Sequence, residues 1–130
     1  MFKRVFVLLL LVAATVSVST PAHASTLGVS LTCYHSSNDP SGTYRFFDCY
    51  AYASGGSPNY TFQWYHNMYG SWSLVKQETT GGYSDVYQLQ CFPPVGSTQA
   101  TSGIAKVVVT DSAGAQVTKQ TSVYCARYVQ

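Results

Sequence analysis

The stretch FDCYAYASGGSPNYTFQW, residues 47–64, carries the strongest structural signal in this chain of 130 residues. From Phe47 to Ala53 every second residue is apolar, which is the period of a β-strand with one buried face. Serine, glycine and proline at 54–58 form a turn that ends this strand. A second alternating run then covers Tyr60–Trp64 and places its three aromatic rings on one face. The stretch therefore predicts two strands joined by a short loop.

The same period continues on both sides of this stretch. Alternating runs cover residues 27–33 before it and 87–91, 105–109 and 117–125 after it, with turn sequences between them such as Asp111–Gly114. No ten-residue segment has helical periodicity together with caps. Short alternating runs separated by regular turns indicate an all-β sandwich or barrel. About 100 residues in roughly seven antiparallel strands suit an immunoglobulin-like sandwich.

Four cysteines, Cys33, Cys49, Cys91 and Cys125, fall on the faces expected to point inward. Their spacing lacks the close pairs of a zinc site, and an even number in an exported chain indicates disulfides. A turn at residues 39–42 sets Cys33 opposite Cys49, which favours the pairs Cys33–Cys49 and Cys91–Cys125. The pairing of Cys49 with Cys91 and of Cys33 with Cys125 stays open.

Residues 1–24 are typical of a secretory signal peptide. Two basic residues precede an apolar run of about ten residues, and an A-x-A-like cleavage site ends at Ala24. The run is too short to span a membrane, which takes about 20 residues. We therefore expect a single mature domain over residues 25–130, starting at Ser25, exported to the periplasm or the outside and carrying no membrane anchor.

Charge excludes several classes of partner. Without Lys3 and Arg4, five basic residues remain against five acidic ones, so the mature chain has no net charge when its histidines are neutral. Charged residues make up 9% of the chain, against roughly 25% in an average soluble domain. Nucleic acids and anionic membrane surfaces attract basic proteins, so we expect neither as a partner.

Three segments resemble bacterial PKD-type and related Ig-like domains. They are the alternating strand and turn at 47–56, the Y-x-F-x-W run at 60–64, and the V-x-V-T-D-S-A-G hairpin at 107–114. Together they span residues 47–117. The acidic W-x-F-G-D-G turn of the PKD family is replaced by Y-H-N-M-Y-G at 65–70, so the chain is closer to the broader Ig-like group. The resemblance implies a domain that binds or spaces and does not catalyse.

A second resemblance concerns the segment Ser122–Arg127, which is similar to the V-Y-Y-C-A-R end of an antibody heavy-chain variable domain. A variable domain has a tyrosine two residues before its second cysteine, and Val123 occupies that position here. Such a domain would also leave the third and fourth cysteines unexplained. The chain therefore resembles PKD-type and Ig-like domains more than an antibody variable domain.

Residues for catalysis are sparse. The chain has five acids and no G-x-S-x-G nucleophile elbow, and Gly81-Gly82 suits a turn better than a phosphate cradle. His35 and His66 are isolated and read as solvated strand or loop residues. We therefore expect no enzyme activity, no cofactor and no metal.

The high content of aromatic residues is the most informative feature of the composition. If odd positions of residues 43–53 point inward, four aromatic side chains point outward and form an apolar patch on one sheet face. A second aromatic group follows the Tyr60–Trp64 strand. The outward residues of the first group are Tyr44, Phe46, Tyr50 and Tyr52, and those of the second are Tyr65, Tyr69 and Trp72. The candidate binding residues are Tyr50, Tyr52, Tyr65, Tyr69 and Trp72.

Three roles for these aromatic groups stay open. They can be cross-strand pairs that only stabilise the sheet. They can bind a cell-surface protein or glycan, because aromatic rings stack on sugar rings and dominate protein interfaces. They can also mediate self-association of a structural secreted or envelope protein. The sequence predicts an extracellular binding module, with the structural or self-associating protein as the alternative.

Overall fold

The computed structural model of the chain describes residues 25–38, 45–68, 70–91 and 101–125. These residues form seven β-strands. The strands are β1 (Gly28–Asn38), β2 (Arg45–Ser54), β3 (Tyr60–Asn67), β4 (Trp72–Thr80), β5 (Ser84–Cys91), β6 (Thr101–Thr110) and β7 (Gln116–Cys125). The all-β prediction and the number of strands are therefore confirmed.

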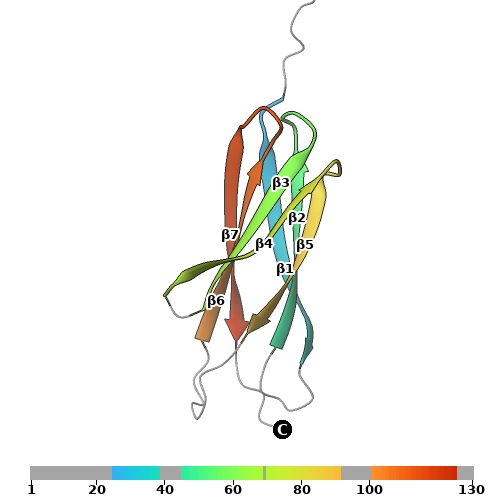
Figure 1. The fold of residues 1–130 in the computed structure, drawn as a ribbon. Helices are drawn as coiled ribbons and strands as arrows, with labels where there is room; N and C mark the ends of the chain where they lie inside the picture. The colour runs from blue at the N-terminus through green and yellow to red at the C-terminus, as the bar shows by residue number, and fades with distance from the viewer. Residues whose placement is uncertain (1–24, 39–44, 69, 92–100, 126–130) are drawn as a thin grey trace, which may run out of the picture.

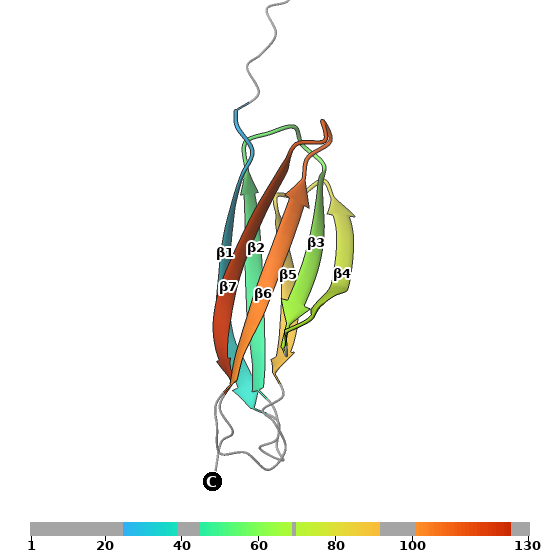
Figure 2. The ribbon, with the colours of Figure 1, turned by 90° about the vertical axis from the view of Figure 1, so that its left-hand side faces the viewer.

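The strands form two antiparallel sheets that pack face to face. One sheet has three strands in the order β1-β2-β5, and the other has four in the order β4-β3-β6-β7. Both views show an elongated molecule whose strands run along its long axis (Figures 1 and 2). Every neighbouring pair is antiparallel, and six of the strands have one face toward the core and one toward solvent. The edge strand β4 has no buried residue.

The core follows the alternation in the sequence. Phe47, Cys49, Ala51 and Ala53 are all buried, as are Tyr60, Phe62 and Trp64 on the next strand and Ala105, Val107 and Val109 on β6. Leu31, Cys33, Tyr87 and Val117 are half-buried at the margins of the same core. The inward faces predicted from period-two alternation are therefore confirmed in every strand named.

Both disulfides join the favoured partners. Cys33 and Cys49 lie directly opposite each other in the β1–β2 register, with their Cα atoms 4.0 Å apart. Cys91 and Cys125 lie at the ends of β5 and β7, so this bond links the two sheets, across a Cα separation of 5.8 Å. The turn at 39–42 that suggested the first pair lies outside the described residues. Two disulfides indicate an oxidising compartment, extracellular or periplasmic.

One end of the sandwich is organised by the Asp111 carboxylate. It accepts hydrogen bonds from the backbone N–H of Ser57 at 2.9 Å, Ala113 at 3.0 Å and Ala115 at 2.8 Å. The β6–β7 turn is thereby tied to the β2–β3 loop. Gly56 in that loop has a φ of 68°, and a Cβ there would lie 2.7 Å from the Asp111 Oδ2 atom, so the close approach requires glycine.

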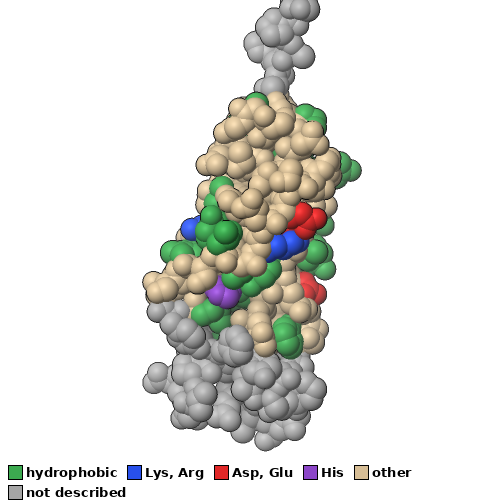
Figure 3. Space-filling view, in the orientation of Figure 1, with side chains coloured by type: hydrophobic (Ala, Val, Ile, Leu, Met, Phe, Trp, Pro, Cys, Tyr) green, Lys and Arg blue, Asp and Glu red, His purple; other side chains and the backbone are tan. Residues whose placement is uncertain are grey.

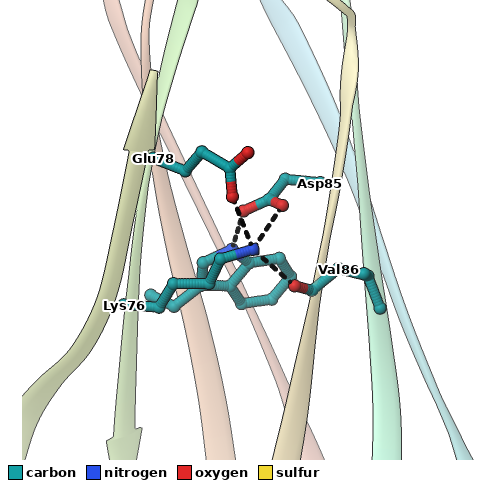
Figure 4. A network of polar contacts seen from close by, with 5 residues as sticks. Lys76, Glu78, Asp85 and Val86 are labelled. Carbon is teal, nitrogen blue, oxygen red and sulfur yellow. Dashed lines mark hydrogen bonds and ion pairs between the residues drawn. The ribbon is translucent and has the colours of Figure 1, made fainter. Parts of the chain in front are cut away.

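The two long edges of the sandwich are closed differently. On one edge β1 and β7 lie side by side (Figures 1 and 2). On the other edge Lys76 of β4 reaches across to β5 (Figure 4). Its Nζ atom lies 2.5 Å from Asp85 Oδ1, 2.9 Å from Glu78 Oε2 and 2.8 Å from the Val86 carbonyl oxygen. Trp64 Nε1 donates to the other Asp85 oxygen at 2.8 Å, so two side chains of the four-stranded sheet bind this carboxylate of the three-stranded sheet.

Candidate functional site

The outer face of the three-stranded sheet carries exposed tyrosines. Tyr50 and Tyr52 point outward from β2 because Cys49, Ala51 and Ala53 point inward. Tyr34 projects from β1 on the same face, opposite Asp48 and diagonal to Tyr50 in the register. Together Tyr34, Tyr50 and Tyr52 are called the tyrosine platform below.

The three platform rings are accessible to solvent. Their exposed fractions are 61% for Tyr34, 37% for Tyr50 and 50% for Tyr52. The Tyr34 and Tyr50 ring centroids lie 6.3 Å apart with the ring planes inclined by 57°. Inclined rings at this distance pack without covering each other's faces, so parts of both remain free for a ligand.

Two open hollows border the tyrosine platform. The first has a volume of about 350 Å³ and is lined by Thr32, Tyr34, Tyr50 and Tyr52. The second has a volume of about 280 Å³ and is lined by Tyr50, Tyr52, Ser84, Asp85 and Val86. Tyr50 and Tyr52 therefore form a ridge with a hollow on each side. These volumes are near the lower end of the range for small-ligand sites.

Short polar side chains flank the ridge. Across the strands, Ser30 and Ser84 lie beside Tyr52, and Thr32 lies beside Tyr50. In the next row Gln88 Nε2 donates to Asp48 Oδ1 at 3.1 Å. Hydroxyls, an amide and one carboxylate thus surround aromatic rings. Such a surface can stack on an apolar ring face while bonding the hydroxyl groups at its rim.

The second aromatic group lies on the other side of the molecule. Tyr65 and Trp72 belong to β3 and β4 of the four-stranded sheet, and both point to its outer face. Tyr65 is half-buried and Trp72 is 41% exposed. Lys106 Nζ lies 4.6 Å from the Tyr65 ring centroid and 4.1 Å from that of Trp72. Tyr69 lies outside the described residues. The five candidate residues therefore do not form one site.

Sequence reasoning did not select two residues that belong to these groups. Tyr34 follows the inward Cys33, so alternation was sufficient to place it outward with Tyr50. Lys106 lies between the inward Ala105 and Val107, and the same argument places it on the outer face. Of the other aromatic residues expected to point outward, Phe46 is half-buried and Tyr44 lies outside the described residues.

The remaining titratable groups have structural surroundings. Burial lowers the pKa of His66, whose Nδ1 lies 3.4 Å from the Tyr87 hydroxyl, and burial raises the pKa of Tyr87. Burial alone would lower the pKa of Lys76, but its bonds to Asp85 and Glu78 outweigh that effect and raise it. Within the described ranges, no group of three or more His, Cys, Asp or Glu side chains could hold a metal ion.

Among the described residues, the chain has no helix that is long and apolar enough to cross a bilayer.

Comparisons with known proteins assign this chain to no family. No family model matches the chain, and no curated protein matches it. Among solved structures it is similar to a Bordetella pertussis protein provisionally assigned as ApaA, with 15% identity and a TM-score of 0.41. The match covers 78% of this chain and 93% of the other. At this similarity the relation carries no argument about function.

Proposed function

We propose that this protein is a secreted, non-catalytic Ig-like domain that binds a neutral glycan of a cell surface through the tyrosine platform. One observation carries the proposal: three exposed tyrosine rings lie together on one sheet face and line two open hollows. Glycans present ring faces of C–H groups that stack on aromatic rings, and hydroxyls that bond to short polar side chains.

The strand order supports the Ig-like part of the proposal. A constant-type Ig domain places strands A, B, E and D in one sheet and C, F and G in the other. Here β1-β2-β5 faces β3-β6-β7 in the same way, and β4 pairs with β3 where the fourth strand of a constant domain pairs with the fifth. The segments that resemble PKD-type domains lie on β2, β3 and the β6–β7 hairpin.

Secretion is proposed from residues 1–24, which lie outside the described residues and whose sequence is typical of a signal peptide. The two disulfides agree with an exported domain. The mature protein, residues 25–130, is therefore the form to test.

Low charge favours a neutral ligand. The charged residues that flank the platform or line its hollows are Asp48 and Asp85, and Asp85 is paired with Lys76. The opposite side of the molecule also has few charged groups, which gather in small spots (Figure 3). A ligand with many charges would lack partners on such a surface, whereas a neutral polymer needs none.

Retention on insoluble polysaccharides and cell-wall preparations tests this function. We expect wild-type protein to be retained on at least one neutral polymer, and Tyr50→Ala/Tyr52→Ala to lose most of that retention, because stacked aromatic side chains carry much of the energy at binding surfaces. Tyr124→Ala is the matched control, since Tyr124 is 64% exposed on β7 of the other sheet. Circular dichroism checks that each variant is folded.

The glycan proposal is wrong if no polymer retains the wild type, or if Tyr124→Ala loses as much retention as the platform double variant.

Self-association is the second candidate function. Val86 is 46% exposed beside Tyr50, so the ridge continues into an aliphatic side chain that a protein partner would cover. If copies of the chain pair through this face, analytical ultracentrifugation will show a size that rises with concentration and without added ligand. Tyr50→Ala/Tyr52→Ala should then remain monomeric at concentrations where the wild type associates.

A further inference from the structure

On the outer face of the four-stranded sheet, a lysine lies against two aromatic rings. Lys106 on β6 lies beside Tyr65 on β3 and beside Gln120 on β7 in the strand register. Trp72 reaches the same place from β4, so that the Lys106 ammonium lies 4.1 Å from one ring centroid and 4.6 Å from the other. Lys106, Tyr65 and Trp72 are called the lysine–aromatic cluster below. Ring faces stabilise a cation at this distance and hold it in place.

No carboxylate compensates this cation among the described residues. Glu78 and Asp85 both bind Lys76 at the β4–β5 edge. Asp111 is held by backbone N–H groups at the β6–β7 turn, and Asp48 lies on the other sheet face. Cation–π contacts use the charge of an ammonium group but give its N–H donors no oxygen acceptor. The Lys106 ammonium therefore remains available to an anionic ligand.

We propose that the lysine–aromatic cluster is a second binding site, separate from the tyrosine platform, and that it takes a carboxylate-bearing pyranose ring. The Lys106 ammonium would bind the carboxylate by a charge-assisted hydrogen bond. The exposed part of the Trp72 ring would stack on the sugar face, and Gln120 beside Lys106 would bond to hydroxyls. The charge distinguishes this ligand from the neutral glycan assigned to the platform, and the two sites lie on opposite sheet faces.

The test compares two ligands that differ only in charge: oligogalacturonate and its methyl ester, titrated into the mature protein. Trp72 is the reporter, because it is exposed whereas Trp64 is fully buried. We expect oligogalacturonate to change the fluorescence and to bind about tenfold more tightly than the ester, the usual scale for a hydrogen bond to a charged group. Lys106→Met should remove this preference, so that the variant binds the acid and the ester with equal affinity.

Lys119→Met is the matched control, because Lys119 is an exposed lysine of β7 in the same sheet. Its preference for the acid should equal that of the wild type. Lys106→Gln serves as a second variant if Lys106→Met does not fold, and Trp72→Phe should abolish the fluorescence change. Tyr50→Ala/Tyr52→Ala should bind oligogalacturonate normally, which separates this proposal from the platform function.

Three results would overturn the proposal. Equal affinity of the wild type for the acid and the ester would show that Lys106 recognises no charge. If Lys119→Met lost the preference for the acid to the same extent as Lys106→Met, the preference would be a general effect of basic residues. A wild type that binds neither ligand would exclude the site for carboxylated pyranoses, whether or not the tyrosine platform binds a neutral polymer.

Discussion

Asp111 shows how one side chain joins segments that are far apart in the sequence. Its carboxylate is almost fully buried and accepts the N–H of Ser57, 54 residues away, as well as those of Ala113 and Ala115 in its own turn. The Ser57 bond is the first cause of a lowered Asp111 pKa, followed by the bonds within the turn. Folding therefore favours the ionised carboxylate over the protonated one.

A lowered pKa predicts acid sensitivity. The stabilisation by Asp111 should be complete above the carboxyl's unfolded pKa of about 3.9 and should be lost as the pH falls through the lower folded value. Asp111→Asn should be less stable than the wild type at pH 7 by several degrees in Tm, and this gap should narrow below about pH 4. Thermal unfolding followed by circular dichroism from pH 7 to pH 2 measures both effects.

Asp48→Asn is the control for this prediction, because the Asp48 carboxylate lies on the outer face of its sheet and accepts a hydrogen bond from the Gln88 side chain. A gap between Asp111→Asn and wild type that stays constant down to pH 2 would contradict the assignment of acid sensitivity to Asp111.

At the scale of elements, the β4–β5 edge depends on an ion pair that faces inward. Lys76 and Glu78 occupy positions of β4 that pair with the inward Trp64 and Phe62, but the edge strand extends past the core. The Asp85 side chain is 7% exposed and that of Lys76 is 30% exposed. Inward charges on an edge strand discourage the addition of another strand, and Lys76 also occupies the Val86 carbonyl oxygen of β5.

Replacing Lys76 by methionine should therefore destabilise the domain. The change leaves the buried Asp85 carboxylate with only the Trp64 N–H, which we expect to cost about 2 kcal/mol, below the usual cost for a fully buried pair because Lys76 is partly exposed. Urea unfolding of Lys76→Met, Asp85→Leu and the double variant measures the coupling free energy between Lys76 and Asp85. The ion pair does not hold this edge if Lys76→Met is no less stable than the exposed-site control Lys119→Met.

At the scale of the whole molecule, the two disulfides stabilise the domain in different ways. Loop-entropy estimates are close, about 3 kcal/mol for a separation of 16 residues and about 4 kcal/mol for 34. However, Cys33–Cys49 joins strands that are already hydrogen-bonded, whereas Cys91–Cys125 joins the two sheets and is fully buried at both ends. Its removal also leaves a cavity between the sheets.

We therefore expect Cys91→Ala/Cys125→Ala to lose more stability than Cys33→Ala/Cys49→Ala, by more than the difference of about 1 kcal/mol that loop length alone gives. Guanidinium unfolding of both double variants and of the oxidised wild type provides the comparison. If both double variants lost the same free energy of unfolding, or if Cys33→Ala/Cys49→Ala lost more, the link between the two sheets would add nothing to the stabilisation from loop closure.

Much of the fold was predictable because its information is local. Alternation from Phe47 to Ala53 and from Tyr60 to Trp64 determines which side chains are buried, since neighbouring residues of a strand point to opposite faces. The same rule places Tyr34, Tyr50, Tyr52 and Lys106 outward. Turn residues such as those at 54–58 and 111–114 mark the strand ends.

The sequence by itself thus determined the alternating strands, their inward and outward faces and the reading of the cysteines as disulfides, but not β4, whose residues do not alternate between buried and exposed. The tertiary structure decided what lies next to what. It placed Tyr34 beside Tyr50, put Tyr65 and Trp72 on the opposite sheet face with Lys106, and brought Lys76 to Asp85 across the open edge. The physical reason is that a period of two specifies the face of a strand but not its neighbours, which depend on how the two sheets pack.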